Sequence, residues 1–320
     1  MNEYIGHETQ LFGVEEHRLI GGRGDGMRLL QVNNGRGLMF TISLDRAGDI
    51  SRLYYNGINL GFFAPCGYVS PQYYDDNGFG FLKSFTAGFF TTCGLTAVGT
   101  PCNDEGEELP LHGTISHIPA ENISYSVENN KIIIRFTVRD ARLFGHKLLL
   151  RREYECPLDK NEITMRDTVE NIDFIDTPYL ILYHINMGYP LLSENSKITI
   201  DSNAIKPRDD NAKKGLNNAL VIEKPQPIYD EQCFYYQMNS GYAKIFNPDL
   251  KFGLSVNYNI NELPEFTEWK LMKSGEYVLG LEPGNCNPDG RDVLRKQGKL
   301  KNLKPGEKIT QTLIFKIENA

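Results

Sequence analysis

Three ionisable side chains of this sequence lie in apolar segments, where an unused charge is costly to bury. The segments are Leu109–Gly113, Tyr179–Leu192 and Tyr277–Asn285, and they contain His112, His184 and Glu282. Histidine titrates near neutral pH, and a partly desolvated glutamate can approach it. Such a pair can give and take protons, which is the chemistry of general acid–base catalysis.

Each of these residues also has a purely structural interpretation. A single histidine in a strand is more often a hydrogen-bonded core or rim residue than a catalyst, and a buried glutamate can simply pair with an arginine. His184 and Glu282 come shortly before glycine and proline residues. That spacing predicts positions near strand ends, from which side chains can face a cleft. The three segments together favour one shared site.

The segments that carry these residues belong to a β-rich chain. Apolar and polar residues alternate along Lys131–Arg139, Glu162–Glu170 and Ile309–Ile317. Period-two alternation is typical of strands with one buried and one wet face, as in antiparallel sheets. We therefore expect an all-β fold, a large antiparallel β-sandwich with few short helices.

Turn residues and chain organisation agree with this picture. Asn-Gly and Asp-Gly pairs supply the positive φ that tight turns need, as at Asn56-Gly57. The glycine-rich segment 21–26 is followed by a strand-like segment, so a turn is favoured over a phosphate loop. The polar segment 209–218 is predicted to be a surface loop. Without an evident repeat or linker, residues 1–320 are expected to form a single domain.

Charge and composition exclude several classes of function and of site. The formal net charge of −7 gives no general attraction to nucleic acid or anionic membranes. No apolar run is long enough to span a membrane, and the N-terminal residues lack a secretory pattern, so a cytoplasmic protein is expected. The six cysteines form no C-x-x-C pair and are predicted to be reduced thiols. Nothing in the sequence favours a metal site.

The three segments, in this order, resemble the aldose 1-epimerase (galactose mutarotase) superfamily, and within it the branch of uncharacterised aldose-epimerase-like proteins. The resemblance extends from about Asp45 to Glu307. The stretches that carry it are Phe85–Gly88, Thr92–Leu95, Leu111–Gly113, Tyr183–Gly188, Leu263-Pro264, Trp269-Lys270 and Gly280–Pro283.

This resemblance implies a β-supersandwich with a sugar cleft across one sheet, and an isomerase of carbohydrate metabolism that interconverts α and β anomers without a cofactor. His184 would be the general acid, Glu282 the general base, and His112 a hydrogen-bonding residue at the ring oxygen or a nearby hydroxyl. The residue types suit this reaction independently. A base removes the proton of the anomeric hydroxyl while an acid protonates the ring oxygen, and we expect Glu282 and His184 on opposite sides of the sugar ring.

The substrate is expected to be a monosaccharide or modified sugar. Better-known mutarotases carry an Asn-Arg pair before the first histidine; here the stretch is Phe81–Phe85, which leaves Lys83 as the candidate. Asn186, Trp269 and Arg291 complete the expected substrate-binding residues, with Trp269 available to stack on a sugar face. Lysine or arginine near the cleft would favour an acidic or phosphorylated sugar.

Two other functions stay open. A sugar-binding or sensing protein on the same scaffold would bind without turnover. A carbohydrate lyase or hydrolase would change the mass of its substrate, and a glycosidase needs two carboxylates beside the scissile bond, where the sequence offers one strong candidate, Glu282. The oligomeric state does not follow from the sequence.

Overall fold

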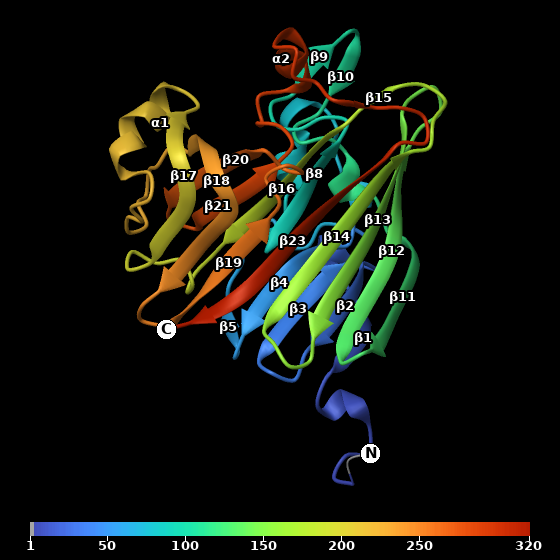
Figure 1. Cartoon of the computed structure of the whole chain (residues 1–320), viewed down its shortest axis with the longest axis vertical. Coiled ribbons are helices and arrows are strands. Elements are labelled where there is room, and N and C mark those ends of the chain that lie inside the picture. The colour runs from blue at the N-terminus through green and yellow to red at the C-terminus, as the bar shows by residue number, and fades with distance from the viewer. Residues whose placement is uncertain (1–2) are drawn as a thin grey trace.

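The computed structural model describes residues 3–320 and is built from two large antiparallel sheets (Figure 1). The larger sheet has twelve strands, of which β17 pairs only with β18. Its strands in spatial order are β11 (Glu121–Glu128), β12 (Lys131–Ala141), β13 (Lys147–Pro157), β14 (Glu162–Asn171), β23 (Lys308–Asn319), β19 (Phe252–Tyr258), β18 (Gln232–Asn247), β20 (Glu265–Lys273), β21 (Glu276–Gly284), β16 (Leu180–Met187) and β8 (Phe90–Leu95), with β17 at Lys197–Pro207.

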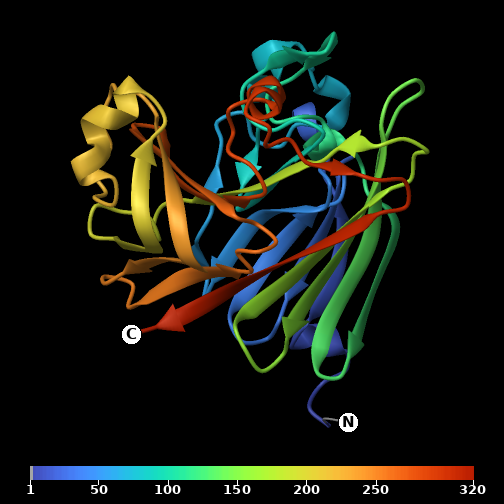
Figure 2. The ribbon, with the colours of Figure 1, turned by 45° about the horizontal axis from the view of Figure 1, so that its top comes forward.

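The smaller sheet contains the first five strands in chain order and packs against the larger one (Figure 2). They are β1 (Gly13–Arg18), β2 (Arg28–Asn33), β3 (Leu38–Ser43), β4 (Asp49–Tyr55) and β5 (Ile58–Asn59). Short pairs join β6 (Phe62–Phe63) to β7 (Ala87–Gly88), β9 (Cys102–Asp104) to β10 (Glu107–Leu109), and β15 (Thr177–Pro178) to β22 (Asn302–Leu303). The helical elements of residues 3–320 are α1 (Asp210–Gly215), α2 (Arg291–Lys296) and the 3₁₀ turns η1 (Glu8–Gln10), η2 (Gly22–Gly24), η3 (Pro71–Tyr73), η4 (Gly78–Lys83), η5 (Ile115–His117) and η6 (Leu216–Asn218).

The architecture confirms the predicted all-β sandwich with few short helices. The three alternating segments are β12, β14 and β23, and most of their apolar residues are buried. Asn56 and Gly57 have φ values of 49° and 79°, as the turn between β4 and β5 requires. The glycine-rich segment 21–26 connects β1 to β2 through η2, without a following helix. The six cysteines are free thiols.

The predicted loop over residues 209–218 is wrong, because most of it is helical. Asp209 caps α1, and its carboxylate accepts a hydrogen bond from the backbone N–H of Ala212 at 2.9 Å. The turn η6 follows directly. An aspartate before a short run of helix-forming residues is a typical N-cap, so the signal was present in the sequence.

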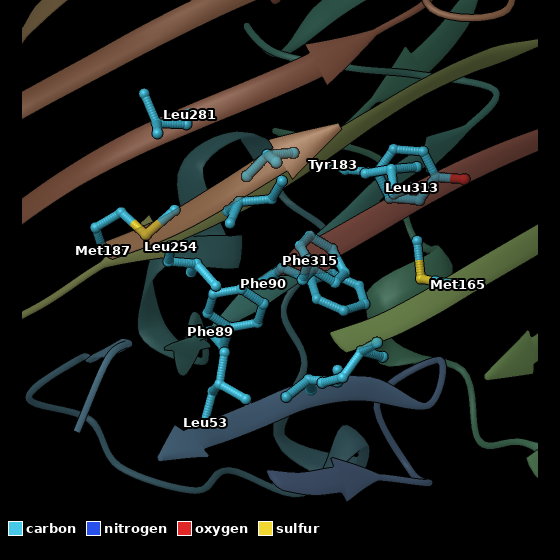
Figure 3. Packing of buried hydrophobic residues seen from close by; sticks show 14 of the residues in the cluster. Leu53, Phe89, Phe90, Met165, Tyr183, Met187, Leu254, Leu281, Leu313 and Phe315 are labelled. Atoms are coloured by element: carbon cyan, nitrogen blue, oxygen red, sulfur yellow. The ribbon is translucent and has the colours of Figure 1, made fainter. Parts of the chain in front are cut away.

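One large cluster of buried side chains fills the space between the sheets. Figure 3 shows part of it, with Leu53 of β4 facing Phe89 and Phe315 across the interface. Leu281 of β21 and Tyr183 of β16 point into this cluster. Because side chains alternate along a strand, Glu282 and His184 point to the opposite face of the larger sheet. The core therefore fixes which face of β16 and β21 carries the ionisable residues.

No helix in the described residues 3–320 has the length and apolar character of a membrane span.

Candidate active site

A cavity of about 190 Å³ lies on the face of the larger sheet that points away from the core. Strands β16, β18, β20 and β21 form its floor, and η4 with the loop around His112 forms one wall. Pockets for drug-sized ligands are roughly 300–1,000 Å³, so this cavity suits one small molecule. Its lining includes His112, His184, Trp269 and Glu282. The structure thus brings four of the residues selected from sequence into one place.

The centre of the pocket is a direct contact between His184 and Glu282. Nε2 of the imidazole lies 3.2 Å from Oε1 of the carboxyl group, and both side chains are almost fully buried. Oε1 nevertheless has no aligned hydrogen-bond partner among residues 3–320. Buried polar atoms are nearly always satisfied, so an orphan atom that faces a cavity is suited to a ligand.

Gly280 makes room for this contact. A Cβ atom at Gly280 would lie only 2.3 Å from Oε1 of Glu282 and 3.0 Å from Cβ of Trp269. Side chains two residues apart on a strand share a face, which explains why the residue beside Glu282 on this face has none. Packing therefore explains why glycine stands at position 280, two residues before Glu282.

Asn186 holds the imidazole of His184 from behind. Its Nδ2 donates a hydrogen bond to the carbonyl oxygen of His184 at 3.0 Å, so its Oδ1 is the atom that faces Nδ1 of the ring, at 2.7 Å. Oδ1 can only accept, and Nδ1 must therefore carry the proton. Nε2 is left to face Glu282. Asn186 is fully buried and does not line the cavity, so the structure gives it a positioning contact instead of the predicted sugar contact.

His112 enters the pocket from a turn and not from a strand. Its φ is +59°, and its ring centroid lies 5.6 Å from that of His184. Nδ1 of His112 is buried and has no hydrogen-bond partner within residues 3–320. Gly113 permits this turn, because a Cβ there would lie 2.2 Å from the carbonyl oxygen of Gly94. The unpaired Nδ1 is a second polar atom suited to a ligand.

Burial controls the protonation of these groups. Desolvation lowers the pKa of His184 to about 4 and that of His112 to about 3. Desolvation, with the nearby Glu231 carboxylate, raises the pKa of Glu282 well above its usual value. Near neutral pH the pair of His184 and Glu282 therefore holds one proton between Nε2 and the carboxyl group.

Aromatic side chains surround the pair. The ring of His184 makes edge contacts with Phe85 and Trp269, at centroid distances of 5.3 and 5.0 Å. The indole N–H of Trp269 donates a hydrogen bond to Oε2 of Glu231 at 2.8 Å. Phe79 and Leu82 of η4 line the cavity and are more than half exposed. Aromatic walls of this kind suit the C–H faces of a sugar ring.

Two further predicted substrate-binding residues, Lys83 and Arg291, lie outside the cavity, as Asn186 does. Lys83 is largely exposed, and its ammonium pairs with Asp75 at 2.6 Å. Arg291 is buried in α2, where it pairs with Asp104 and Glu107 at 2.5 Å each. Both carboxylates satisfy the guanidinium, so its role is to anchor α2 to the β9–β10 hairpin.

Several lining residues were not predicted from sequence, among them Arg208, Glu231 and Cys233. Arg208 follows β17, and its backbone N–H bonds the carbonyl of Cys233 at 3.0 Å. Only the pairing of β17 with β18 brings these residues to the pocket, and that pairing is not visible in local sequence. Within residues 3–320, no group of three His, Cys, Asp or Glu side chains is placed to hold a metal ion.

Comparison with known proteins gives the family. Residues 24–317 match DUF4432, described as a domain of unknown function. The chain belongs to the DUF4432 family. A comparison with curated proteins gave no match.

Solved structures place this DUF4432 protein among the mutarotase-like folds. A provisionally named aldose 1-epimerase of Klebsiella pneumoniae is 26% identical, with a TM-score of 0.91 over 98% of this chain and 86% of the other. A galactose mutarotase-like protein of Clostridium acetobutylicum is 13% identical, with a TM-score of 0.71 over 97% of this chain and 100% of the other. A galactose 1-epimerase of Lactobacillus acidophilus is 14% identical, with a TM-score of 0.65 over 97% and 99%. These matches confirm the resemblance to the aldose 1-epimerase superfamily, in an uncharacterised branch.

Proposed function

We propose that this protein is a cofactor-independent aldose 1-epimerase, and that His184 and Glu282 act as its acid–base pair. The observation that carries the proposal is their 3.2 Å contact at the floor of a small cavity lined by aromatic rings. The fold shared with proteins named as aldose and galactose epimerases supports it at the level of the superfamily.

The contact between the two groups changes the expected geometry. A sugar ring cannot lie between atoms 3.2 Å apart, so the acid and the base do not flank the ring as expected from the sequence. Mutarotation does not require that arrangement. The anomeric hydroxyl oxygen and the ring oxygen are both bonded to C1, so an adjacent pair presented to that edge of the sugar can reach both.

The single proton of the pair is sufficient for the whole cycle. With the proton on Nε2 of His184, the Glu282 carboxylate takes the proton of the anomeric hydroxyl. The bond between C1 and the ring oxygen breaks, and that oxygen receives the proton from Nε2. The pair is then neutral histidine and protonated glutamic acid, the form that burial favours. After the carbonyl end rotates, Glu282 protonates the carbonyl oxygen, His184 takes back the hydroxyl proton, and the ring closes as the other anomer.

The remaining pocket residues orient the sugar. Nδ1 of His112, unpaired and neutral, is suited to a hydrogen bond with a sugar hydroxyl or the ring oxygen. Trp269 offers a stacking surface that its bond to Glu231 keeps in place. Nδ1 of His184 stays bound to Asn186 throughout, so only Nε2 exchanges protons.

Exchange spectroscopy by NMR tests the proposal. At equilibrium, the α-to-β exchange rate of aldoses, uronic acids and sugar phosphates is measured without protein, with wild-type protein, and with His184→Ala. The exposed His17→Ala on β1 is the matched control. Acceleration by wild type and His17→Ala that is lost in His184→Ala supports the proposal. Binding without acceleration would instead indicate a sugar-binding protein.

Glycoside hydrolysis is a second candidate, because the pocket contains a second carboxylate, Glu231. Glycosidases use two carboxyl groups beside the scissile bond. Glu231, however, is engaged with the indole of Trp269, and the cavity suits one ring better than a glycosidic pair. Mass analysis of the reaction separates the two, since an epimerase leaves the substrate mass unchanged and a hydrolase adds water.

A further inference from the structure

We infer that the sugar bound here carries an anionic group at the end remote from C1, and that Arg208 binds it. This inference rests on the proposed function for the identity of the sugar. The residue that carries it played no part in the acid–base mechanism. Arg208 lines the cavity together with His184 and Glu282.

Arg208 lacks a carboxylate partner. No ion pair within the described residues 3–320 involves it. Within the described residues, its side chain donates a hydrogen bond from Nη1 to the thiol of Cys233, at 3.5 Å. A guanidinium has five N–H donors, and a thiol is a weak acceptor. Most of the donor capacity of Arg208 therefore remains open.

The nearby carboxylate of Glu231 does not form an ion pair with the guanidinium of Arg208. Glu231 lines the same cavity but accepts the indole N–H of Trp269, and no nitrogen of Arg208 lies within 4.0 Å of its oxygens. When a sugar displaces water from this region, the guanidinium loses solvation. A neutral hydroxyl compensates this loss less well than an oxyanion, since charge-assisted hydrogen bonds are roughly twice as strong as neutral ones.

The sheet register separates the strand beside Arg208 from the strand that carries Glu282. Cys233, which Arg208 contacts, is opposite Trp269, and Trp269 is opposite Gly280 on the strand that carries Glu282. Two strand spacings separate Cys233 from β21, or about 10 Å. C6 is the exocyclic carbon on C5 of a hexopyranose, so with C1 at the His184–Glu282 pair an anionic substituent on C6 extends beyond the ring and can reach Arg208 in the same cavity. A C6 carboxylate or a C6 phosphate ester presents the planar or forked oxygens that a guanidinium binds in bidentate fashion.

A binding experiment with sugars that cannot mutarotate tests Arg208 separately from catalysis. The probes are 1,5-anhydroglucitol and 1,5-anhydrogalactitol, which lack the anomeric hydroxyl, with their 6-phosphates and their C6 carboxylate analogues. Calorimetry is run on wild type, Arg208→Met, Arg208→Lys and the control Arg139→Met, an exposed arginine of β12. We expect one anionic class to bind wild type and Arg139→Met at least about tenfold more tightly than the neutral parent.

Arg208→Met should weaken binding of the anionic probe by about 10- to 100-fold, as the loss of a charge-assisted hydrogen bond predicts. Binding of the neutral parent should be unchanged. Arg208→Lys should retain part of the preference. Whichever probe binds more tightly, the phosphate or the carboxylate, shows which of the two anionic groups the site prefers. Equal binding of neutral and anionic probes, or an equal loss for both in Arg208→Met, overturns the inference and leaves the epimerase proposal intact. Anion-selective binding without anomer exchange in any sugar overturns the epimerase proposal and leaves the role of Arg208.

Discussion

At the scale of single residues, the site depends on how the imidazole of His184 is held. Oδ1 of Asn186 accepts a hydrogen bond from Nδ1 of the ring at 2.7 Å, and Oε1 of Glu282 lies 3.2 Å from Nε2. Both contacts come from strand neighbours that the backbone fixes. His184, Glu282 and His112 could be selected as candidates from sequence, because ionisable residues in apolar segments are unusual. The contact between His184 and Glu282, and the positioning contact of Asn186, needed three-dimensional geometry.

The pH dependence of activity reports this arrangement. Below about pH 4, a second proton binds to the pair, at His184. Neither group can then accept a proton from the sugar. The exchange rate of wild type should therefore fall as the pH drops through about 4. Asn186→Asp places a carboxylate beside Nδ1, which favours the imidazolium and raises the pKa of His184 by about one unit or more. The acid limb of the pH–rate profile, measured by NMR exchange, should move upward accordingly.

Asn186→Leu is the control for this prediction. It removes the contact without adding a charge, so it should lower kcat by about 10- to 100-fold, with little change in KM and no upward shift of the acid limb. An Asn186→Asp profile that coincides with wild type would show that Asn186 does not govern the protonation of His184.

At the scale of elements, β20 carries different chemistry on its two faces. Thr267 and Trp269 line the cavity, whereas Glu268 and Lys270 are buried on the other side. Glu268 accepts a hydrogen bond from Tyr236 at 2.6 Å, and Lys270 donates to backbone carbonyls of Asn218 and Val221 behind η6. This strand therefore ties the α1–η6 segment to the sheet next to the site.

Glu268 makes folding stability depend on pH. Burial raises its pKa from 4.5 to about 7, so the folded state binds this proton more tightly than the unfolded chain. Its contribution is complete below about pH 4.5 and is lost as the pH rises through 7, a loss of about 3 kcal/mol. Glu268→Gln cannot ionise and should lose less stability between pH 5 and 8. Urea unfolding at both pH values measures this.

Glu121→Gln, at an exposed position of β11, serves as the reference substitution. If Glu268→Gln and wild type lose the same free energy of unfolding between the two pH values, Glu268 is ionised in the folded protein.

Local alternation predicted β12, β14 and β23 correctly because each has one buried and one wet face. The glycine and proline residues that follow His184 and Glu282 predicted positions near strand ends, but His184 lies well inside β16, which is buried along its whole length. A strand covered on both faces carries no alternation, so its limits cannot be read from the pattern. Arg208, Glu231 and Cys233 were missed because only the tertiary pairing of β17 with β18 brings them to the pocket.

At the scale of the whole molecule, a buried ion cluster joins the two sheets. Arg152 of β13 pairs with Asp167 of β14 at 2.6 Å and with Asp49 of β4, in the other sheet, at 2.7 Å. The guanidinium is fully buried, and Oγ1 of Thr92 accepts another of its hydrogen bonds at 2.8 Å. No local pattern in the sequence marks which charged residues meet inside the core.

Removal of Arg152 should therefore be strongly destabilising. Arg152→Met leaves two carboxyl groups buried without their cation, which costs about 3–5 kcal/mol in comparable cases. Thermal and urea unfolding measure the loss, with the exposed Arg139→Met as control. A loss below about 1 kcal/mol would mean that the two sheets are held together without this cluster.

The most direct test of the central claim is a double-mutant cycle on the acid–base pair. NMR exchange rates are compared for wild type, His184→Ala, Glu282→Gln and the double variant, each confirmed as folded by circular dichroism. If one shared proton serves both groups, each single change should slow exchange by about 10²- to 10⁴-fold, and the double variant should be little slower than either. Losses that multiply in the double variant, or single variants that retain the wild-type rate, would contradict the account.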